Sequence, residues 1–216
     1  MHFDILVEDK SGKKALELLV PNIIGGEHTF KVKSYKGIGR IPRNLQTTAD
    51  PAKRILLAQL PKLLRGYGKT YAGYPQAYPA VLVLVCDLDD KCPVTFKQEL
   101  NAILHACAPQ PKTRFCFAIE EGEAWFLGDI AAIKAAYPAV KASVLHSYSN
   151  DSICGTWERL ADAIYPGGSV KLSHGGYQKV GAVKSEWATT IAPCMDVENN
   201  DSPSFCYFRD KLRSLT

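Results

Sequence analysis

Carboxylate side chains occur in three short runs, and each run directly follows an apolar stretch of the chain. Carboxylate oxygens are ligands that Mg²⁺ prefers in proteins, and they also act as general acids and bases. The three runs comprise Glu8 with Asp9, Asp87 with Asp89 and Asp90, and Glu120 with Glu121 and Glu123. If the fold brings them together, they predict a divalent-cation site.

The segments before these runs have the composition of buried strands. Strands are predicted over residues 3–7, 29–35, 80–86 and 114–119, because these segments are short, apolar or alternating, and bounded by polar residues. Helices are predicted between them over residues 12–20, from an N-cap at Asp50 toward Arg65, and over residues 95–106. This alternation predicts an α/β fold with a Rossmann-like open, mostly parallel sheet flanked by helices.

Ligands bind outside the carboxyl ends of the strands in such a sheet, and three of the predicted strands end in carboxylates. Crowded carboxylates disfavour one another's ionisation, and a hard divalent cation relieves that cost. Each run also has a purely structural explanation, since acids stabilise turns and the first turns of helices. A joint metal site is favoured because all three runs fall at one predicted edge of the sheet.

The first third of the chain is basic. Up to Pro75 there are 13 Lys and Arg against 6 Asp and Glu, although the whole chain carries a net charge of only +4. A glycine-containing loop with Lys36, Arg40 and Arg43 lies in this part. We expect these three residues to contact a nucleic-acid backbone beside the acidic edge. The alternative is an ordinary solvated turn, because many surface turns have this composition.

The acidic pattern resembles the TOPRIM domain of topoisomerases, primases and OLD-family nucleases. The resemblance is carried by I-L-V-E-D at the first strand and by a D-x-D pair after a later apolar strand, and it covers roughly residues 1–129. I-E-E-G-E-A-W-F-L-G-D and D-S-P-S-F-C-Y-F-R-D-K-L-R are similar to a narrower bacterial group. That group is a TOPRIM-like family of unknown function that is often paired with AAA ATPases in anti-phage loci.

The resemblance implies a role for each matching residue. Glu8 matches the TOPRIM glutamate and Glu123 the additional acid of the narrower group, so both are expected to be catalytic. Asp87 and Asp89 match the metal-binding D-x-D pair, and Glu120 beside them is taken as a further candidate metal ligand. The implied cofactor is Mg²⁺ or Mn²⁺, and the implied reaction is hydrolysis of phosphodiester bonds in DNA or RNA.

Two segments are predicted along the chain: a TOPRIM-like α/β core over residues 1–136 and a helical C-terminal extension over residues 137–216 that packs on the core. Within the extension, helices are predicted over residues 157–164, 184–191 and 203–215, and a Gly/Ser-rich loop over residues 166–176. No apolar run reaches the roughly 18 residues that span a bilayer. With no signal segment recognised at the N-terminus, we expect a cytoplasmic protein without a membrane partner.

The favoured interpretation is therefore a Mg²⁺-dependent nuclease, the effector of a bacterial anti-phage system, with nucleic acid and an AAA- or ABC-type ATPase as partners. One alternative is a catalytically silent TOPRIM-like module that only binds such an ATPase. Another is a receiver-type phosphorylation domain, which also carries acids after its first strand and an aspartate after a central strand. Strand synthesis and topoisomerisation rank last, because the chain has no accessory zinc-binding region and no tyrosine in an obvious winged-helix context.

Overall fold

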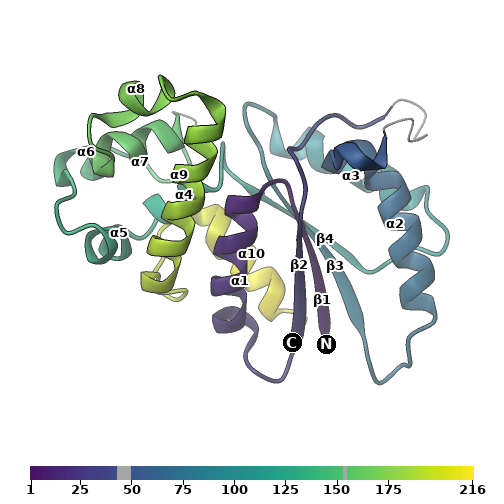
Figure 1. Ribbon diagram of the computed structural model, residues 1–216. Coiled ribbons are helices and arrows are strands. Elements are labelled where there is room, and N and C mark those ends of the chain that lie inside the picture. Colours follow the sequence, from purple (N-terminus) through teal and green to yellow (C-terminus); the bar gives the residue numbers. More distant parts are fainter. Residues whose placement is uncertain (43–49, 153–154) are drawn as a thin grey trace.

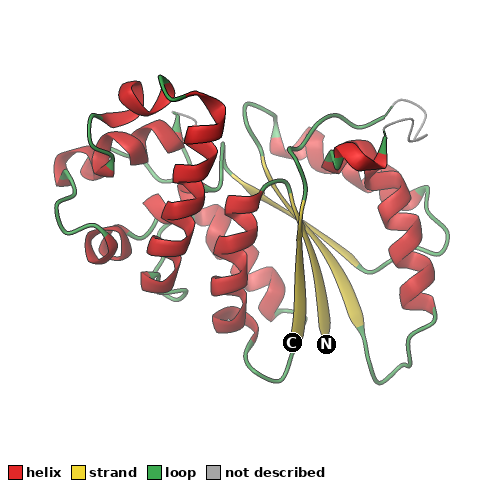
Figure 2. Ribbon diagram, in the orientation of Figure 1, coloured by secondary structure: helices red, strands yellow, loops and turns green. Residues whose placement is uncertain are grey.

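The structure is a computed structural model that describes residues 1–42, 50–152 and 155–216. These residues form one sheet of four parallel strands in the order β2-β1-β3-β4, a twisted fan between two layers of helices in Figure 2. The predicted α/β fold with an open, parallel sheet is confirmed. The strands are β1 (His2–Val7), β2 (Thr29–Ser34), β3 (Ala80–Asp87) and β4 (Thr113–Ala118).

Both faces of the two central strands are covered, which explains why these strands are almost continuously apolar. In β1, Ile5 and Val7 pack into the hydrophobic cluster under α1, whereas Leu6 packs into the cluster under α2 and α3. Figure 1 shows α1 and α10 on one side of the sheet and α2 and α3 on the other. These helices are α1 (Lys10–Ile24), α2 (Leu56–Ala72), α3 (Pro93–His105) and α10 (Pro203–Arg213).

Two helix starts differ from the prediction. Helix α1 begins at Lys10 rather than near residue 12, because Asp9 is its N-cap and accepts a hydrogen bond from the backbone N–H of Gly12 at 2.7 Å. Asp50 does not open α2. It accepts a hydrogen bond from the backbone N–H of Ala52 at 2.9 Å and starts the 3₁₀ helix η2 (Pro51–Lys53), and α2 follows from Leu56.

The chain after β4 is helical, as expected, but richer in helix than the sequence indicates. The predicted Gly/Ser-rich loop over residues 166–176 is wrong, because most of it forms α8. Gly167 and Gly176 have φ angles of 94° and 74°, so the glycines mark the breaks between helices. None of the helices within the described ranges is long and apolar enough to cross a bilayer. The elements are α4 (Glu123–Leu127), α5 (Ile130–Ala136), α6 (Ala142–His146), α7 (Thr156–Ile164), α8 (Gly168–Ser173), α9 (Gly176–Ile191) and η3 (Ala192–Cys194).

The C-terminal helices share one hydrophobic core with the sheet. Trp125 of α4 lies with its ring centroid 5.0 Å from that of Phe208 and 5.6 Å from that of Phe205, both in α10. Its indole N–H donates to the hydroxyl of Ser204 at 3.0 Å. Since this cluster also contains the α1 face of β1 and β3, residues after 136 complete the core of the residues before them.

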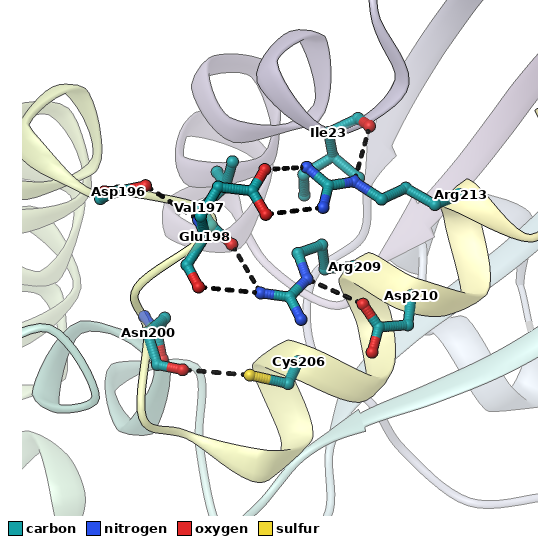
Figure 3. A network of polar contacts seen from close by, with 9 residues as sticks. All are labelled: Ile23, Asp196, Val197, Glu198, Asn200, Cys206, Arg209, Asp210 and Arg213. Atoms are coloured by element: carbon teal, nitrogen blue, oxygen red, sulfur yellow. Dashed lines mark hydrogen bonds and ion pairs between the residues drawn. The ribbon is translucent and has the colours of Figure 1, made fainter.

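A polar network fixes the end of the chain against α1 (Figure 3). The guanidinium of Arg213 forms a two-pronged ion pair with Glu198 and donates to the backbone carbonyl of Ile23 at 3.3 Å. Arg209 donates to the backbone carbonyl of Val197 at 2.9 Å. These contacts join α10, the segment before it and the C-terminal end of α1, so the last helix is held on the core by polar contacts as well as apolar ones.

Candidate active site at the carboxyl edge of the sheet

The strand order creates a switch point between β1 and β3. From β1 the chain continues to β2 on one side and later returns to β3 on the other side, which leaves a crevice outside the carboxyl ends of β1 and β3. Glu8 directly follows β1, and Asp87 ends β3. The carboxylate of Glu8 accepts a hydrogen bond from the backbone N–H of Asp87 at 3.3 Å. The fold therefore brings together two acids that lie 79 residues apart in the sequence.

Burial and like charge act together on these two carboxyl groups. Burial, followed by the negative charges of Asp9 and Asp89, raises the pKa of Glu8 from 4.5 to about 7. Burial, followed by the charge of Glu8, raises the pKa of Asp87 well above its ordinary value. Neither side chain forms an ion pair with a residue that the structure describes. The crevice thus favours a bound cation or proton.

A lysine from the C-terminal helices neutralises the acids on the other side of the crevice. The ammonium nitrogen of Lys184, in α9, lies 2.9 Å from a carboxylate oxygen of Glu123 and 3.3 Å from one of Glu121. Burial alone would lower the pKa of Lys184, but these carboxylates outweigh it and raise the pKa. Burial raises the pKa of Glu121 to about 7, and Lys184 opposes that increase. Lys184 therefore stays charged, and its charge also attracts the carboxylate of Asp87.

A small cavity of 40 Å³ lies between these groups. Its polar wall carries the carboxylates of Glu8, Asp87 and Glu123 together with the ammonium of Lys184. Its other wall consists of apolar residues of the core. The predicted catalytic residues Glu8 and Glu123 thus share one cavity with the predicted metal ligand Asp87.

The other two predicted metal ligands have different contacts. The carboxylate of Asp89 lies 2.6 Å from the ammonium of Lys91. Both carboxylate oxygens of Glu120 accept backbone N–H groups at 2.7 Å, from Gly155 and Thr156 at the start of α7. Since its oxygens already satisfy a helix terminus, we assign Glu120 to capping rather than to metal binding. Asp89 remains a candidate ligand, because it lies close enough to Glu8 for its negative charge to raise the pKa of Glu8.

The basic loop runs along this acidic edge. The backbone N–H of Gly37 donates to the backbone carbonyl of Glu8 at 2.8 Å, which ties the loop to the end of β1. The neighbouring Lys36 is exposed, and so is Arg40. Arg43, the third predicted nucleic-acid contact, lies outside the described residues. The backbone beside Lys36 is therefore tied to the end of β1, whereas Arg40 lines a different hollow of the surface together with Lys91 and Phe96.

The donor set fits one Mg²⁺ that brings further ligands of its own. Within residues 1–42, 50–152 and 155–216, no three His, Cys, Asp or Glu side chains are arranged to enclose a metal ion by themselves. Mg²⁺ is commonly held by one or two carboxylates, with water and substrate phosphate completing its ligand shell. Glu8 and Asp87 would suit this requirement, since their groups are hydrogen-bonded to each other and neither forms an ion pair with another described residue.

Sequence reasoning missed Lys184 and gave no individual role to Glu121. Lys184 follows β4 by more than sixty residues, and no local motif marks it. The only signal is the surplus of carboxylates at one sheet edge, which requires a compensating cation from elsewhere in the chain. Comparison of the chain with protein-family models, curated proteins and solved structures gives no significant match.

Proposed function

We propose that this protein is a Mg²⁺- or Mn²⁺-dependent phosphodiesterase that hydrolyses DNA or RNA. The observation that carries the proposal is the meeting of Glu8 and Asp87 at the β1/β3 switch point, in a crevice where neither forms an ion pair with another described residue. The exposed Lys36, whose neighbour Gly37 is hydrogen-bonded to Glu8, and the exposed Arg40 of the same loop support a polyanionic substrate. Lys184 on the far side limits the negative charge that a phosphate would meet.

The acidic residues of the crevice would have different roles in the reaction. Glu8 and Asp87 would hold the cation, with Asp89 available if its carboxylate leaves Lys91. The cation would supply positive charge to the scissile phosphate and to the oxyanion that develops on it. Before a cation binds, Glu8 is suited to proton transfer near neutral pH, since its pKa is raised to about 7, and a bound cation would lower that pKa. Glu123 would act indirectly, because its ion pair with Lys184 holds that ammonium at the cavity wall.

The resemblance to the narrower TOPRIM-like group extends the proposal to biology. We propose that the nuclease acts in the cytoplasm as the effector of a bacterial anti-phage system and works with an AAA- or ABC-type ATPase. These parts rest on the resemblance alone, whereas the reaction class also rests on the geometry of the crevice.

A second candidate, the catalytically silent module that binds a partner ATPase, is favoured by Lys184. A buried ammonium among carboxylates supplies the positive charge that a metal ion would otherwise bring, and a site neutralised in this way needs no cofactor. The receiver-type alternative shares the strand order, but that fold carries a fifth parallel strand after the fourth. The described residues that follow β4 form helices instead.

Cleavage of labelled nucleic acid tests the proposal. We would incubate the protein with single-stranded and duplex DNA and RNA, with Mg²⁺ or Mn²⁺, and with or without any ATPase encoded in a neighbouring gene. The parent should cut, and Glu8→Gln should bind but not cut. The matched control is Glu17→Gln, an exposed acid of α1 that pairs with Lys13 at 3.5 Å. No cleavage by the parent under any of these conditions would favour the silent module.

A further inference from the structure

A second polar region lies on the α2 face of the sheet, toward the amino ends of β1 and β2. At this level the strands present polar side chains where the face is otherwise apolar. Asp4 of β1 is in register with Lys31 of β2, and Lys33 follows two residues later on the same face. Farther along β1, this face becomes apolar again, because Leu6 packs in the hydrophobic core. The amino-terminal part of this face therefore meets its covering helix through polar contacts rather than apolar packing.

Helix α2 changes in the same way along its length. Leu60 and Leu64 are fully buried against the sheet, Tyr67 and Tyr71 continue their i, i+3, i+4 stripe, and Tyr74 follows just after the helix ends at Ala72. The tyrosine rings form a continuous series with the ring of residue 78. Successive ring centroids are 5.5, 5.6 and 5.7 Å apart. The apolar contact between α2 and the sheet therefore ends in a row of tyrosine rings at the surface of the protein.

A buried carboxylate fixes the inner part of this row. Asp4 is only 5% exposed, and it accepts hydrogen bonds from the hydroxyls of Tyr71 at 2.9 Å and Tyr67 at 3.4 Å. The ammonium of Lys33 lies 3.4 Å from Asp4 and 2.5 Å from the hydroxyl of Tyr67. Burial and the charge of Asp4 raise the pKa of both tyrosines, so they remain hydrogen-bond donors. The rings are thus held in place before any ligand arrives.

These elements enclose an open groove of 750 Å³, within the size range of ligand-binding clefts. Three ammonium groups line it, from Lys31, Lys33 and Lys62, against the single buried carboxylate of Asp4. Tyr74 lies at the groove and is 37% exposed, and Tyr78 beyond it is 43% exposed. At the wall, a Cβ atom on Gly66 would meet nothing within 4 Å. Space, positive charge and the partly exposed ring of Tyr74 therefore coincide, and Tyr78, stacked on His2 with a centroid distance of 6.0 Å, lies beyond the groove.

We propose that this groove binds single-stranded nucleic acid, with the lysines on its phosphates and Tyr74 and Tyr78 stacked on its bases. Lysines along a groove, combined with aromatic faces, are the features that bind unpaired strands without sequence preference. A duplex hides its base faces, so it would use only the lysines. An acidic peptide would use the lysines but has no planar group for the rings. The groove would make single-stranded nucleic acid the substrate of the proposed nuclease. Binding in the groove does not depend on nuclease activity; only the cleavage of the bound strand rests on the proposed function.

Fluorescence anisotropy in EDTA measures binding without cleavage, and labelled oligo-dT is the probe. We expect Tyr74→Ala to weaken binding about 10-fold and Tyr74→Phe to bind like the parent, because the ring is retained. Gly66→Leu should block the groove without weakening the helix. Lys62→Gln should lower the slope of log affinity against log salt by about 0.7. Circular dichroism of each variant checks folding.

Several results would overturn the groove proposal. These are equal binding of duplex or of polyglutamate, equal losses in Tyr74→Ala and Tyr74→Phe, and unchanged binding by Gly66→Leu. A dimer that Gly66→Leu converts to a monomer in sedimentation would show that a second copy occupies the groove. Binding that depends on Tyr74, by a parent that never cleaves with metal, would leave the groove intact and reject the nuclease. If the parent cleaves nucleic acid and Tyr74→Ala changes neither cleavage nor binding, the nuclease proposal stands and the groove proposal is rejected.

Discussion

Replacing Glu8 by Gln should stabilise the metal-free protein at neutral and alkaline pH. The folded state raises the pKa of Glu8 from 4.5 to about 7. Below pH 4.5 the side chain is protonated in both states and costs nothing. Between pH 4.5 and 7 the folded state keeps a proton that the unfolded state releases, so stability falls as pH rises, and the full cost is present above pH 7.

The size of this effect follows from the pKa difference. At about 1.4 kcal/mol per pKa unit the upper limit is about 3 kcal/mol. Because Glu8 is partly exposed and interacts with Asp87, we expect about 1–2 kcal/mol. Gln keeps the shape and an oxygen that can accept the N–H of Asp87. For a chain of 216 residues, this gain corresponds to a melting temperature roughly 2–8 °C higher.

Urea unfolding in EDTA at pH 5, 6, 7 and 8 measures the prediction. The difference in unfolding free energy between Glu8→Gln and the parent should be smallest at pH 5 and should grow to its full value at pH 8. Glu17→Gln, on the exposed face of α1, should show no such growth. A Glu8→Gln protein that is no more stable than the parent at pH 8 would refute the reasoning that the carboxylate is destabilised by burial and like charge.

Three further perturbations address other parts of the structure. Lys184→Ala should lower the free energy of unfolding by about 3 kcal/mol in urea unfolding, because it leaves the buried Glu123 unpaired. Mg²⁺ should restore part of this loss. An unchanged free energy of unfolding would contradict the ion-pair assignment. Replacing Lys36 and Arg40 together with Ala should lower the salt slope of nucleic-acid binding by about 1–2, and an unchanged slope would make the loop an ordinary surface turn. Asp151→Asn should lower the unfolding free energy by about 1 kcal/mol, because the carboxylate accepts hydrogen bonds at the start of α10 and Asn tolerates the φ of 56°; thermal unfolding measures it, and no change in melting temperature would contradict it.

Local sequence patterns predicted the sheet, and they placed Glu8 and Asp87 at the same edge of it. An apolar strand followed by carboxylates specifies where each acid lies, and parallel strands bring Glu8 and Asp87 to the same edge without further information. The patterns could not separate ligands from caps. Glu120 and Asp87 both follow strands, yet Glu120 caps α7. That difference depends on a helix more than thirty residues away, which no local pattern encodes.

The remaining features depend on contacts between distant elements. Lys184 reaches the acids only because α9 packs against α1, and the basic groove exists only because α2 ends over the polar part of β1 and β2. The sequence did show an excess of basic residues in the first third of the chain. It could not show that Lys31, Lys33 and Lys62 line one groove with a row of tyrosines, since this requires the register of β2 and the direction of α2.

Calorimetric titration of Mg²⁺ into the metal-free protein tests the central claim most directly, namely that Glu8 and Asp87 form a divalent-cation site. We expect saturable binding by the parent and by Glu17→Gln. Binding should be lost in Glu8→Gln and in Asp87→Asn, while both proteins remain folded. Equal heats for all four proteins, or no heat from a folded parent, would contradict the claim.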